Sequence, residues 1–391
     1  MNNRERENAT LNFISNIDRG AVEETFFPWN LTIDRWLNEG LTLELTEHLW
    51  CPKGKVVNNE DGYLNCLMTE GVNKLEEFFG FDSIKRLFFG LPLSCFDRKT
   101  LQENEEYIIR QDADGWHRQY FKNSGLIKEI KPPVTCENDW EDLKAKAKEQ
   151  LEKYYTDENI KRIFGAYREG HKNGEYSIRM SIQGFFWTPR ILLGIEEHMY
   201  AFYDCPELLH DMNEFFLQVY LDKLGKVLDI LPADVLYIME DLSGANGPML
   251  SKEHFDEFVG AYYKILVPFL KEHGVRNIFV DTDGDFTKLI PNFMDAGIEG
   301  FLPMDVNSGV DIVAVRKTFP SLKFIGGFNK LEIAKGKDAI DKEFERLLPV
   351  IRQGGYIPGS DHQVAPSTSF ENYLYYITKL KETMLQACKD A

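Results

Sequence analysis

The sequence predicts an α/β protein, a (β/α)8 barrel of the TIM type, with an N-terminal extension and an insertion that contains a β-hairpin. Short apolar runs of β-strand character alternate with longer stretches of helical pattern, and the runs span residues 235–239, 277–280, 300–304, 323–325 and 355–357. Their last apolar residues lie 41, 24, 21 and 32 positions apart, the spacing expected when helical crossovers join parallel strands. Each run ends in polar residues or glycines, and parallel barrels build their active sites at these strand ends. The chain is therefore predicted to be a barrel enzyme.

The N-terminal part of the chain is predicted to begin this barrel. Residues 3–20 have apolar positions at helical spacing and form the extension. Residues 26–29 are predicted to end a first barrel strand, and a helix from about 32 to 38 follows before a stop at Gly40. From about 41 to 135 the β/α pattern lapses, and we expect this excursion to pack on the barrel. The whole chain, 1–391, is thus predicted to be one domain.

The excursion contains one clear hairpin pattern. Residues 107–111 and 116–121 are rich in β-forming residues and flank a turn sequence from Asp112 to Gly115. Beyond residue 135 the β/α pattern resumes. The sequence predicts a helix at about 139–155, a strand at 178–182, helices at about 188–202 and 206–229, and a further helix from Ser251.

The composition excludes several classes of protein. The 391 residues carry 63 acidic and 45 basic side chains, a net charge of −18, which disfavours nucleic acid or an anionic membrane as a partner. Six cysteines without a CxxC pair are typical of reduced thiols. No apolar run approaches the ~20 residues of a membrane span, and the N-terminus lacks the apolar core of a signal peptide. We expect a cytoplasmic enzyme that acts on a small molecule.

The most informative strand end is the acidic cluster at 281–285. If the strand continues through Asp281 and Asp283, its period of two places both side chains on one face, where they would point into the barrel mouth. Such a pair can bind a hard cation, hold a cationic group or share a proton. The alternative is a turn in which aspartates cap the next helix, and this is the favoured interpretation for Asp285.

Two further strand ends supply candidates for catalysis. His362 follows the run at 355–357 and is predicted to be a proton donor, a hydrogen-bond donor or a metal ligand. Asp361 beside it either orients the histidine or caps the following turn. After the run at 235–239, either Glu240 or Asp241 should face inward. Alternation from the apolar residues of that run favours Glu240 as the catalytic residue.

The remaining candidates are predicted to contact substrate. Asp305 and Asn329 end the next two strands, and each either contacts substrate or caps a loop. Arg35 is a candidate that could equally form a surface ion pair. The aromatic residues that follow the strand at 178–182 line an apolar pocket or pack in the core, and they are Phe185, Phe186 and Trp187. The sequence lacks a phosphate-binding GxxxxGK[ST] loop and a G-x-S-x-G nucleophile elbow, and no cysteine lies at these strand ends.

These segments resemble the uroporphyrinogen decarboxylase superfamily, whose α/β barrels include decarboxylases and corrinoid-linked methyltransferases. The resemblance runs over most of the chain and is clearest at residues 186–190, 246–249, 280–285 and 354–363. It implies a barrel enzyme of this superfamily.

Two departures from the superfamily motifs bear on the activity that this resemblance implies. The decarboxylases carry an arginine-rich N-terminal motif, whereas the corresponding residues 27–35 contain one arginine, Arg35. The coenzyme M methyltransferases hold zinc with an HxC pair and a later cysteine, whereas the matching pair here is Asp281 and Asp283. A set formed by Asp281, Asp283 and His362 would still offer zinc oxygen and nitrogen ligands.

The resemblance leaves three functions open. The favoured one is transfer of a methyl group from a small methoxy-type donor to a corrinoid on a partner protein, with zinc as a possible Lewis acid. The second is decarboxylation of a tetrapyrrole acid without a cofactor, in which one aspartate holds the pyrrole nitrogens and His362 assists. The third is a non-catalytic barrel that binds a tetrapyrrole or a corrinoid. Uroporphyrinogen itself is disfavoured, because its many carboxylates would meet an acidic mouth with a single arginine.

Overall fold

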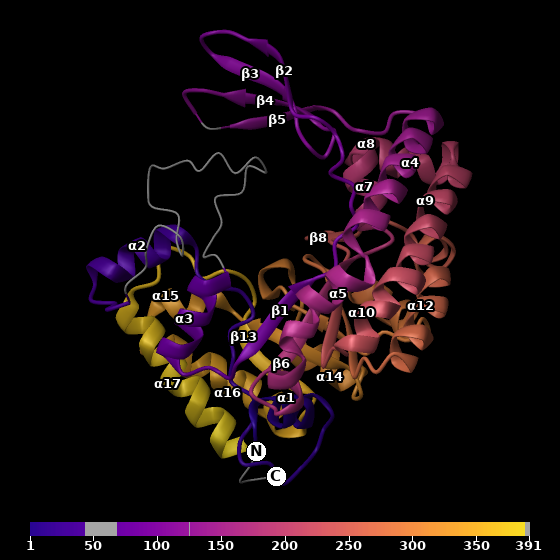
Figure 1. The fold of residues 1–391 in the computed structure, drawn as a ribbon. Helices are drawn as coiled ribbons and strands as arrows, with labels where there is room; N and C mark the ends of the chain where they lie inside the picture. The colour runs from indigo at the N-terminus through magenta and orange to yellow at the C-terminus, as the bar shows by residue number, and fades with distance from the viewer. Residues whose placement is uncertain (44–68, 125, 388–391) are drawn as a thin grey trace.

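The computed structural model describes residues 1–43, 69–124 and 126–387, which form a barrel with a projecting arm (Figure 1). The main sheet is parallel and curled, and its strand order is β1-β6-β7-β10-β11-β12-β13. The bounds of these strands are β1 (Ile84–Phe88), β6 (Ser177–Gln183), β7 (Val235–Met239), β10 (Asn277–Asp281), β11 (Gly300–Leu302), β12 (Lys323–Phe328) and β13 (Tyr356–Ser360). None of the helices within the described ranges combines the length and apolar character needed to cross a membrane.

An extended segment at residues 20–25 takes the eighth position of the barrel, between β13 and β1. The N–H of Asp82, just before β1, donates to the carbonyl of Val22 over 2.8 Å. On the other side, the N–H of Ser360 in β13 donates to the carboxylate of Glu24 over 2.6 Å. The segment has no regular ladder with either neighbour, but these bonds close the circle. The predicted TIM-type barrel is confirmed.

Two separate groups of apolar side chains hold the barrel together. One fills the interior and is formed by Leu11, Ala21, Val235, Phe279, Leu302, Ile325 and Ile357, with Tyr237 packed against it. The other, much larger group lies between the sheet and the surrounding helices. Leu11 belongs to α1 (Asn3–Leu11), and it brings this helix against the interior group. The strands run from this core toward polar ends, which form the barrel mouth.

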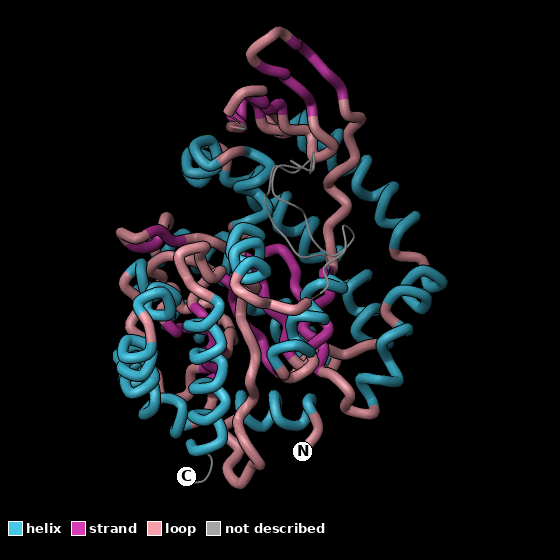
Figure 2. The backbone as a smooth tube through the Cα atoms, turned by 90° about the vertical axis from the view of Figure 1, so that its left-hand side faces the viewer, coloured by secondary structure: helices cyan, strands magenta, loops and turns pink. Residues whose placement is uncertain are grey.

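The outer layer consists of helices that alternate with the strands (Figure 2). Their bounds are α2 (Asn30–Asn38), α3 (Thr69–Phe79), α4 (Glu137–Tyr154), α5 (Asp157–Ile163), α6 (Arg168–Lys172), α7 (Trp187–Leu193), α8 (Ile195–Asp204), α9 (Pro206–Val219), α10 (Gly225–Ile230), α11 (Lys252–Phe255), α12 (Ala261–Glu272), α13 (Ile290–Asp295), α14 (Ile312–Thr318), α15 (Lys330–Lys335), α16 (Lys337–Gln353) and α17 (Phe370–Ala387). A two-residue pairing of β8 (Ser243–Gly244) with β9 (Gly247–Pro248) lies after β7.

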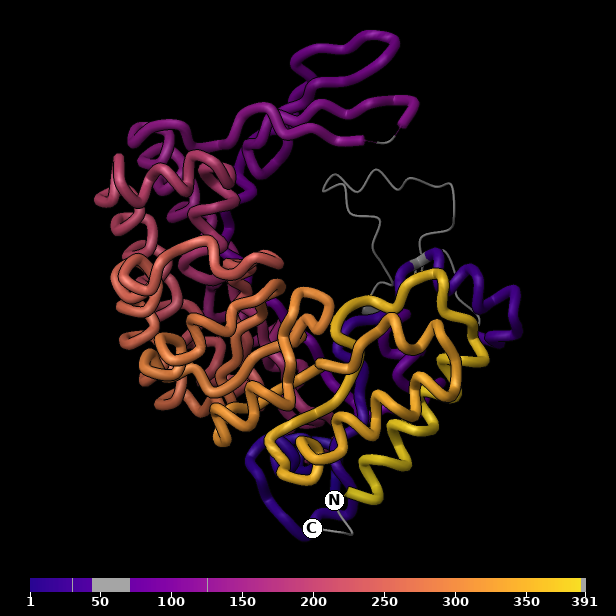
Figure 3. Tube along the Cα trace, turned by 180° about the vertical axis from the view of Figure 1, so that it is seen from behind, coloured from indigo at the N-terminus to yellow at the C-terminus, as the bar shows by residue number. Residues whose placement is uncertain are grey.

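A four-stranded antiparallel sheet forms the arm, which projects from the barrel at the top of Figures 1 and 3. Its strands are β2 (Lys99–Glu103), β3 (Tyr107–Gln111), β4 (His117–Phe121) and β5 (Ile127–Lys131). The predicted hairpin is the β3–β4 pair, in which Tyr107 lies opposite Phe121. Residues 44–68 of the predicted excursion at 41–135 lie outside the described residues. Of the rest, the strand β1 belongs to the barrel and the arm projects from it.

Two predictions for the N-terminal end were wrong. The first helix ends at Leu11 and not near residue 20, because Phe13 and Asn16 adopt positive φ angles of 56° and 62°, which a right-handed helix excludes. The first barrel position is taken by residues 20–25 and not by residues ending at 26–29. The strand β1 was missed altogether, because Lys85 and Arg86 interrupt its apolar pattern.

Candidate functional site

The carboxyl end of β10 brings two aspartates to the barrel mouth. Phe279 belongs to the interior core, and the alternation of the strand continues from it to Asp281 and Asp283. Thr282 between them is buried and faces the other way, where its hydroxyl accepts the N–H of Leu242 over 3.3 Å. The side chains of Asp281 and Asp283 therefore share one face of the strand.

Asp281 lies closest to the interior core, and its carboxyl group has no hydrogen bond to any of the described residues. Burial and the neighbouring carboxylates of Asp241 and Asp283 raise its pKa well above the usual range. Burial and Asp283 also raise the pKa of Asp241. Like charges this close resist simultaneous ionisation, so Asp241 and Asp281 stay protonated to a higher pH than isolated aspartates.

The inward orientation predicted for Glu240 was wrong, because the structure turns this side chain toward the helix layer. Glu240 is fully buried, and its carboxylate accepts the backbone N–H groups of Phe185, Phe186 and Trp187 over 3.0, 2.9 and 2.9 Å. The hydroxyl of Tyr263 donates a fourth hydrogen bond. Glu240 therefore anchors the N-terminal end of α7 and does not reach the mouth.

Asp241 takes the inward position instead. Its φ of 40° is positive, which is uncommon for a residue other than glycine. The N–H of Asp283 donates to its carboxylate over 3.2 Å. Its own carbonyl accepts a hydrogen bond from Arg190 Nη1 over 2.7 Å. The guanidinium of Arg190 lies 5.1 Å from the centre of the Trp187 ring, so α7 supplies a cation and an aromatic ring next to Asp241.

His362 completes the group of titratable residues at the mouth. Its Nε2 lies 3.6 Å from Asp283 Oδ2, and the two side chains are 30% and 42% exposed. Its ring lies 5.1 Å from that of Phe26, measured between centroids. His362 also acts electrostatically on Asp241, whose pKa it lowers. The structure thus brings Asp241, Asp281, Asp283 and His362 together, and all four residues are partly exposed.

Asp361 plays a structural part. Its carboxylate is fully buried and accepts the N–H of Val306 over 3.2 Å, the Asn307 amide over 3.0 Å and the N–H of Lys330 over 3.0 Å. It therefore joins the loops after β11, β12 and β13. Of the two roles considered for Asp361, orienting the histidine or holding a turn, these contacts support the second.

The structure places the substrate-contact candidates of the next strand ends in caps. The Asp305 carboxylate accepts the N–H of Asn307 over 3.2 Å and the hydroxyl of Ser308. The Asn329 side chain accepts the N–H of Leu331 over 3.1 Å at the start of α15. Both residues therefore follow the loop-cap alternative.

Arg35 is held away from the aspartates. Its Nε lies 2.6 Å from Glu39 Oε1, and its Nη1 donates to the carbonyls of Pro366 and Ser367 over 2.9 and 2.8 Å. The arginine fastens α2 to the loop before α17. This arrangement matches the ion-pair alternative and keeps the guanidinium of Arg35 engaged.

Of the three aromatic candidates, two belong to the core. Phe185 and Phe186 are 1% and 0% exposed, and they pack against Tyr263 and Phe202 of the helix layer. An apolar pocket formed by these two rings is therefore contradicted. Trp187 is partly exposed and stacks on the arginine beside Asp241, so it remains available to a bound molecule.

The residues of the mouth do not form a prepared metal site. Across the described ranges, no group of three or more histidine, cysteine, aspartate or glutamate side chains has the arrangement needed to hold a metal ion. The predicted set of Asp281, Asp283 and His362 includes one imidazole, and its Nε2 is 3.6 Å from the nearer carboxylate. A distance of this size suits two ligands of one ion, but the described residues bring no third ligand into place, so they do not form a zinc site as they stand.

Sequence reasoning missed Asp241 as the inward residue, although a signal was available. The interior core includes Val235, with Tyr237 packed against it, and the same alternation leads through Met239 to Asp241. The prediction instead followed the strongly apolar residues of β7, which face the helix layer. In a barrel the outward face is the more apolar one when polar groups line the mouth.

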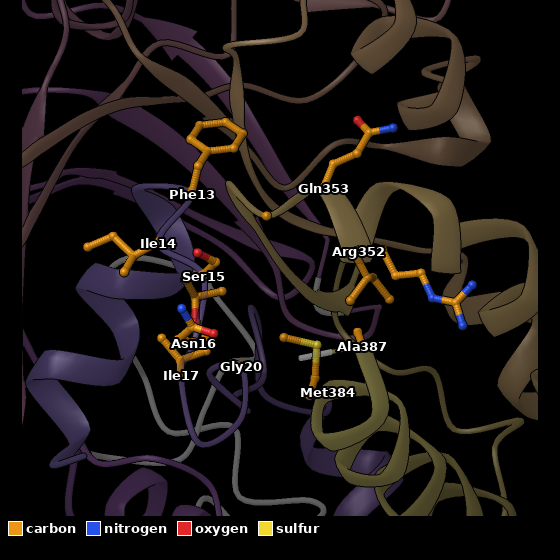
Figure 4. A pocket seen from close by; sticks show the side chains of 13 residues that line it. Phe13, Ile14, Ser15, Asn16, Ile17, Gly20, Arg352, Gln353, Met384 and Ala387 are labelled. Atoms are coloured by element: carbon orange, nitrogen blue, oxygen red, sulfur yellow. The ribbon is translucent and has the colours of Figure 1, made fainter. Parts of the chain in front are cut away.

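A pocket at the opposite end of the barrel is a poor candidate for chemistry. It lies between the turn after α1, the end of α16 and the end of α17 (Figure 4). Phe13, Ile17 and Met384 give it a largely apolar wall, and Arg352 and Gln353 lie at its side. Among the described residues, its lining includes no acid, histidine or cysteine.

The fold is that of an α/β barrel, and its candidate site lies at the carboxyl ends of the strands. Residues 119–383, more than half of the chain, match the model of the family described as "Uroporphyrinogen decarboxylase (URO-D)". The chain therefore belongs to the uroporphyrinogen decarboxylase family.

Solved structures support the same fold. A methyltransferase from Methanosarcina mazei superposes with a TM-score of 0.59 and 13% sequence identity, over 98% of this chain and 99% of that one. At this identity the likeness shows the fold alone. No curated protein matches the sequence.

Proposed function

We propose that this protein is a methyltransferase that takes the methyl group of a small methoxy-type donor and passes it to a corrinoid carried by a partner protein. The observation that carries the proposal is Asp281, a carboxyl group at the base of the mouth without a hydrogen-bond partner among the described residues and with a raised pKa. Such a group keeps its proton to a higher pH than an ordinary aspartate and can donate it.

The chemistry needs a proton at one defined place. When the bond between the methyl carbon and the donor oxygen breaks, the methyl group moves to the acceptor and both bonding electrons stay on the oxygen. Asp281 gives its proton to that oxygen, so the donor leaves as a neutral alcohol or phenol. The corrinoid supplies the nucleophile that accepts the methyl group. His362 Nε2 lies 3.6 Å from Asp283 Oδ2, so the imidazole can pass a proton from solvent to the carboxyl groups after Asp281 has given its proton away.

The accessibility of the mouth suits an acceptor carried by another protein. Asp283 and His362 are 42% and 30% exposed, so the site is reached from outside the barrel. The exposed part of Trp187 offers an apolar surface to an aromatic donor.

The charge of the mouth opposes a substrate with many carboxylates. Asp241, Asp281 and Asp283 stand together, and Arg190 is the nearby arginine that offsets them. Arg35 is engaged by Glu39 and two carbonyls. This charge disfavours decarboxylation of a tetrapyrrole acid, which is the competing function. Detection of decarboxylation would overturn the proposal.

The test is methyl transfer from methoxylated aromatics to cob(I)alamin by the purified protein. Asp281→Asn should lower the rate by about 100-fold or more, because general acid catalysis contributes about 10²–10⁴-fold. Asp305→Asn is the matched control, since Asp305 caps a loop at the neighbouring strand end, and its rate should stay within about twofold of the wild type. Conversion of uroporphyrinogen without methyl transfer, or equal rates for Asp281→Asn and wild type, would contradict the proposal.

A further inference from the structure

The arm exposes both faces of its sheet. Every residue of β2 and β5 is exposed, and no residue of β3 or β4 is buried. Small sheets usually gain stability by packing one face on another element. Figures 1 and 3 show from opposite sides that the arm stands away from the barrel. The arm therefore has a surface that the described part of the chain leaves unused.

One face of the arm satisfies its own charges. Arg110 and Arg118 lie opposite each other in β3 and β4, and both bind Asp112, at 2.6 and 3.0 Å. The hydroxyl of Tyr120 donates to the same carboxylate over 2.5 Å. Glu129 of β5 lies opposite Arg118. This internal network pairs the charges of this face with one another.

The other face is basic. Cross-strand partners share a face, and the register assigns ten residues to it: Lys99, Gln102, Tyr107, Ile109, Gln111, His117, Gln119, Phe121, Lys128 and Lys131. Contacts confirm this assignment, since the Tyr107 and Phe121 rings lie 6.3 Å apart and His117 Nε2 is 3.2 Å from Gln111 Oε1. We call these ten residues the basic face, because they include three lysines and no carboxylate.

The lysines of the basic face lie at the surface, and one of them acts on a nearby carboxylate, since hydrogen bonds from Thr135 and the charge of Lys131 lower the pKa of Asp139. Lys99, Lys128 and Lys131 are exposed, and none forms an ion pair with a residue in the described ranges. The arm from Lys99 to Lys131 is neutral overall, so the net charge of −18 falls entirely on the rest of the chain. A cationic and aromatic surface therefore extends from an acidic body.

We propose that the basic face docks on the acidic barrel body of a second copy of this chain. The complementary surfaces are then both present in one protein, and a twofold arrangement uses the contact twice, once from each arm. The two acidic bodies repel each other only weakly at physiological salt, where the Debye length is about 8 Å. Charges in direct contact therefore decide the association. Tyr107 and Phe121 supply the apolar area that such contacts need.

The test is the oligomeric state of the full-length protein by analytical ultracentrifugation at 0.1 M and 1 M salt. We expect a dimer at the lower salt and a shift toward monomer at the higher one. Reversing the three lysines to glutamate (Lys99→Glu, Lys128→Glu, Lys131→Glu) should weaken the dimer by about 100-fold or more, since like charges across an interface are strongly unfavourable.

A control with the same change in net charge separates local contact from total charge. Lys252, Lys317 and Lys342 are exposed and lie on the outer helices, and their reversal to glutamate should leave the dimer intact. Circular dichroism establishes that both triple variants are folded. A monomeric wild type at 0.1 M salt would overturn the proposal, and so would a dimer that the arm variant leaves unchanged. Equal weakening by both triple variants would also overturn it.

Discussion

Replacing Glu240 with glutamine should destabilise the barrel and leave turnover per folded molecule unchanged. One oxygen of the wild-type carboxylate accepts the N–H of Phe185 and the hydroxyl of Tyr263, and the other accepts the N–H groups of Phe186 and Trp187. Glutamine keeps a single acceptor oxygen, so two of these four donors lose their acceptor and face an amide NH₂ group.

The expected size of the effect follows from two opposing contributions. A buried donor without an acceptor costs about 1–3 kcal/mol, and two are created. Burial also raises the pKa of Glu240 to about 7, so the neutral amide avoids part of the cost of a buried charge, about 1.4 kcal/mol per pKa unit. The rise of about 2.5 pKa units makes this offset about 3.5 kcal/mol at pH 8. The two donors cost about 2–6 kcal/mol together, so we expect a net loss of at most about 2–3 kcal/mol at pH 8 and a larger loss at pH 5, where most of the offset is absent.

The sign of the pH dependence follows from the raised pKa. A carboxyl group whose folded pKa lies above its unfolded value makes the folded state less stable as the pH rises between the two. For Glu240 this interval runs from 4.5 to about 7. The difference in stability between the wild type and Glu240→Gln should therefore be largest near pH 5 and smaller at pH 8.

The assay is urea unfolding at both pH values, combined with methyl transfer measured per folded molecule. Glu345→Gln, on the exposed side of α16, is the matched control and should change neither quantity. A Glu240→Gln protein with unchanged stability and no turnover would refute the structural role and restore the catalytic role that the sequence suggested.

Two further predictions concern other buried charges. Asp281→Asn should equal or exceed the wild type in thermal stability at pH 7, because it removes a carboxyl group whose pKa is raised by burial, Asp241 and Asp283. The advantage of the variant should vanish as the pH falls to about 4. A difference in stability that stays constant across this pH range would contradict the prediction. Arg179→Met should lower the free energy of unfolding by about 3–5 kcal/mol, because the guanidinium binds the buried carboxylates of Glu7 and Glu23. Chemical unfolding measures this loss. An equally stable variant would contradict the prediction and would mean that the two carboxyl groups are protonated when the guanidinium is absent.

Repeating β/α units could be predicted from the sequence because each buried strand is a short apolar run with a polar end. This reasoning located β7, β10, β11, β12 and β13. It failed for β1, where Arg86 is compensated by Glu76 of α3 over 2.5 Å. A lysine or arginine within a run of residues predicts an exposed segment. Only the position of a partner elsewhere in the chain shows that the residue belongs to a packed strand, and the local sequence does not contain this information.

The candidate site was predictable only in part, for a related reason. The pair of Asp281 and Asp283 follows from the period of a strand, which is a local property. The choice between Glu240 and Asp241 depends on the positive φ of Asp241 and on three backbone N–H groups at the start of α7, which attract the glutamate. Neither this φ angle nor the position of these N–H groups can be inferred from the five residues of β7.

The way the eighth barrel position is filled has a consequence for biosynthesis. Glu24 emerges early from the ribosome, yet the groups that bind it, Ser360 and Tyr373, follow 336 and 349 residues later. Contacts of such separation form slowly, and nascent chains fold from the N-terminal side as they are made. The N-terminal segment must therefore wait, with its carboxylate in water, until almost the entire polypeptide has been translated. A nascent chain stalled before residue 360 would be an open sheet whose two edges are both available to other chains.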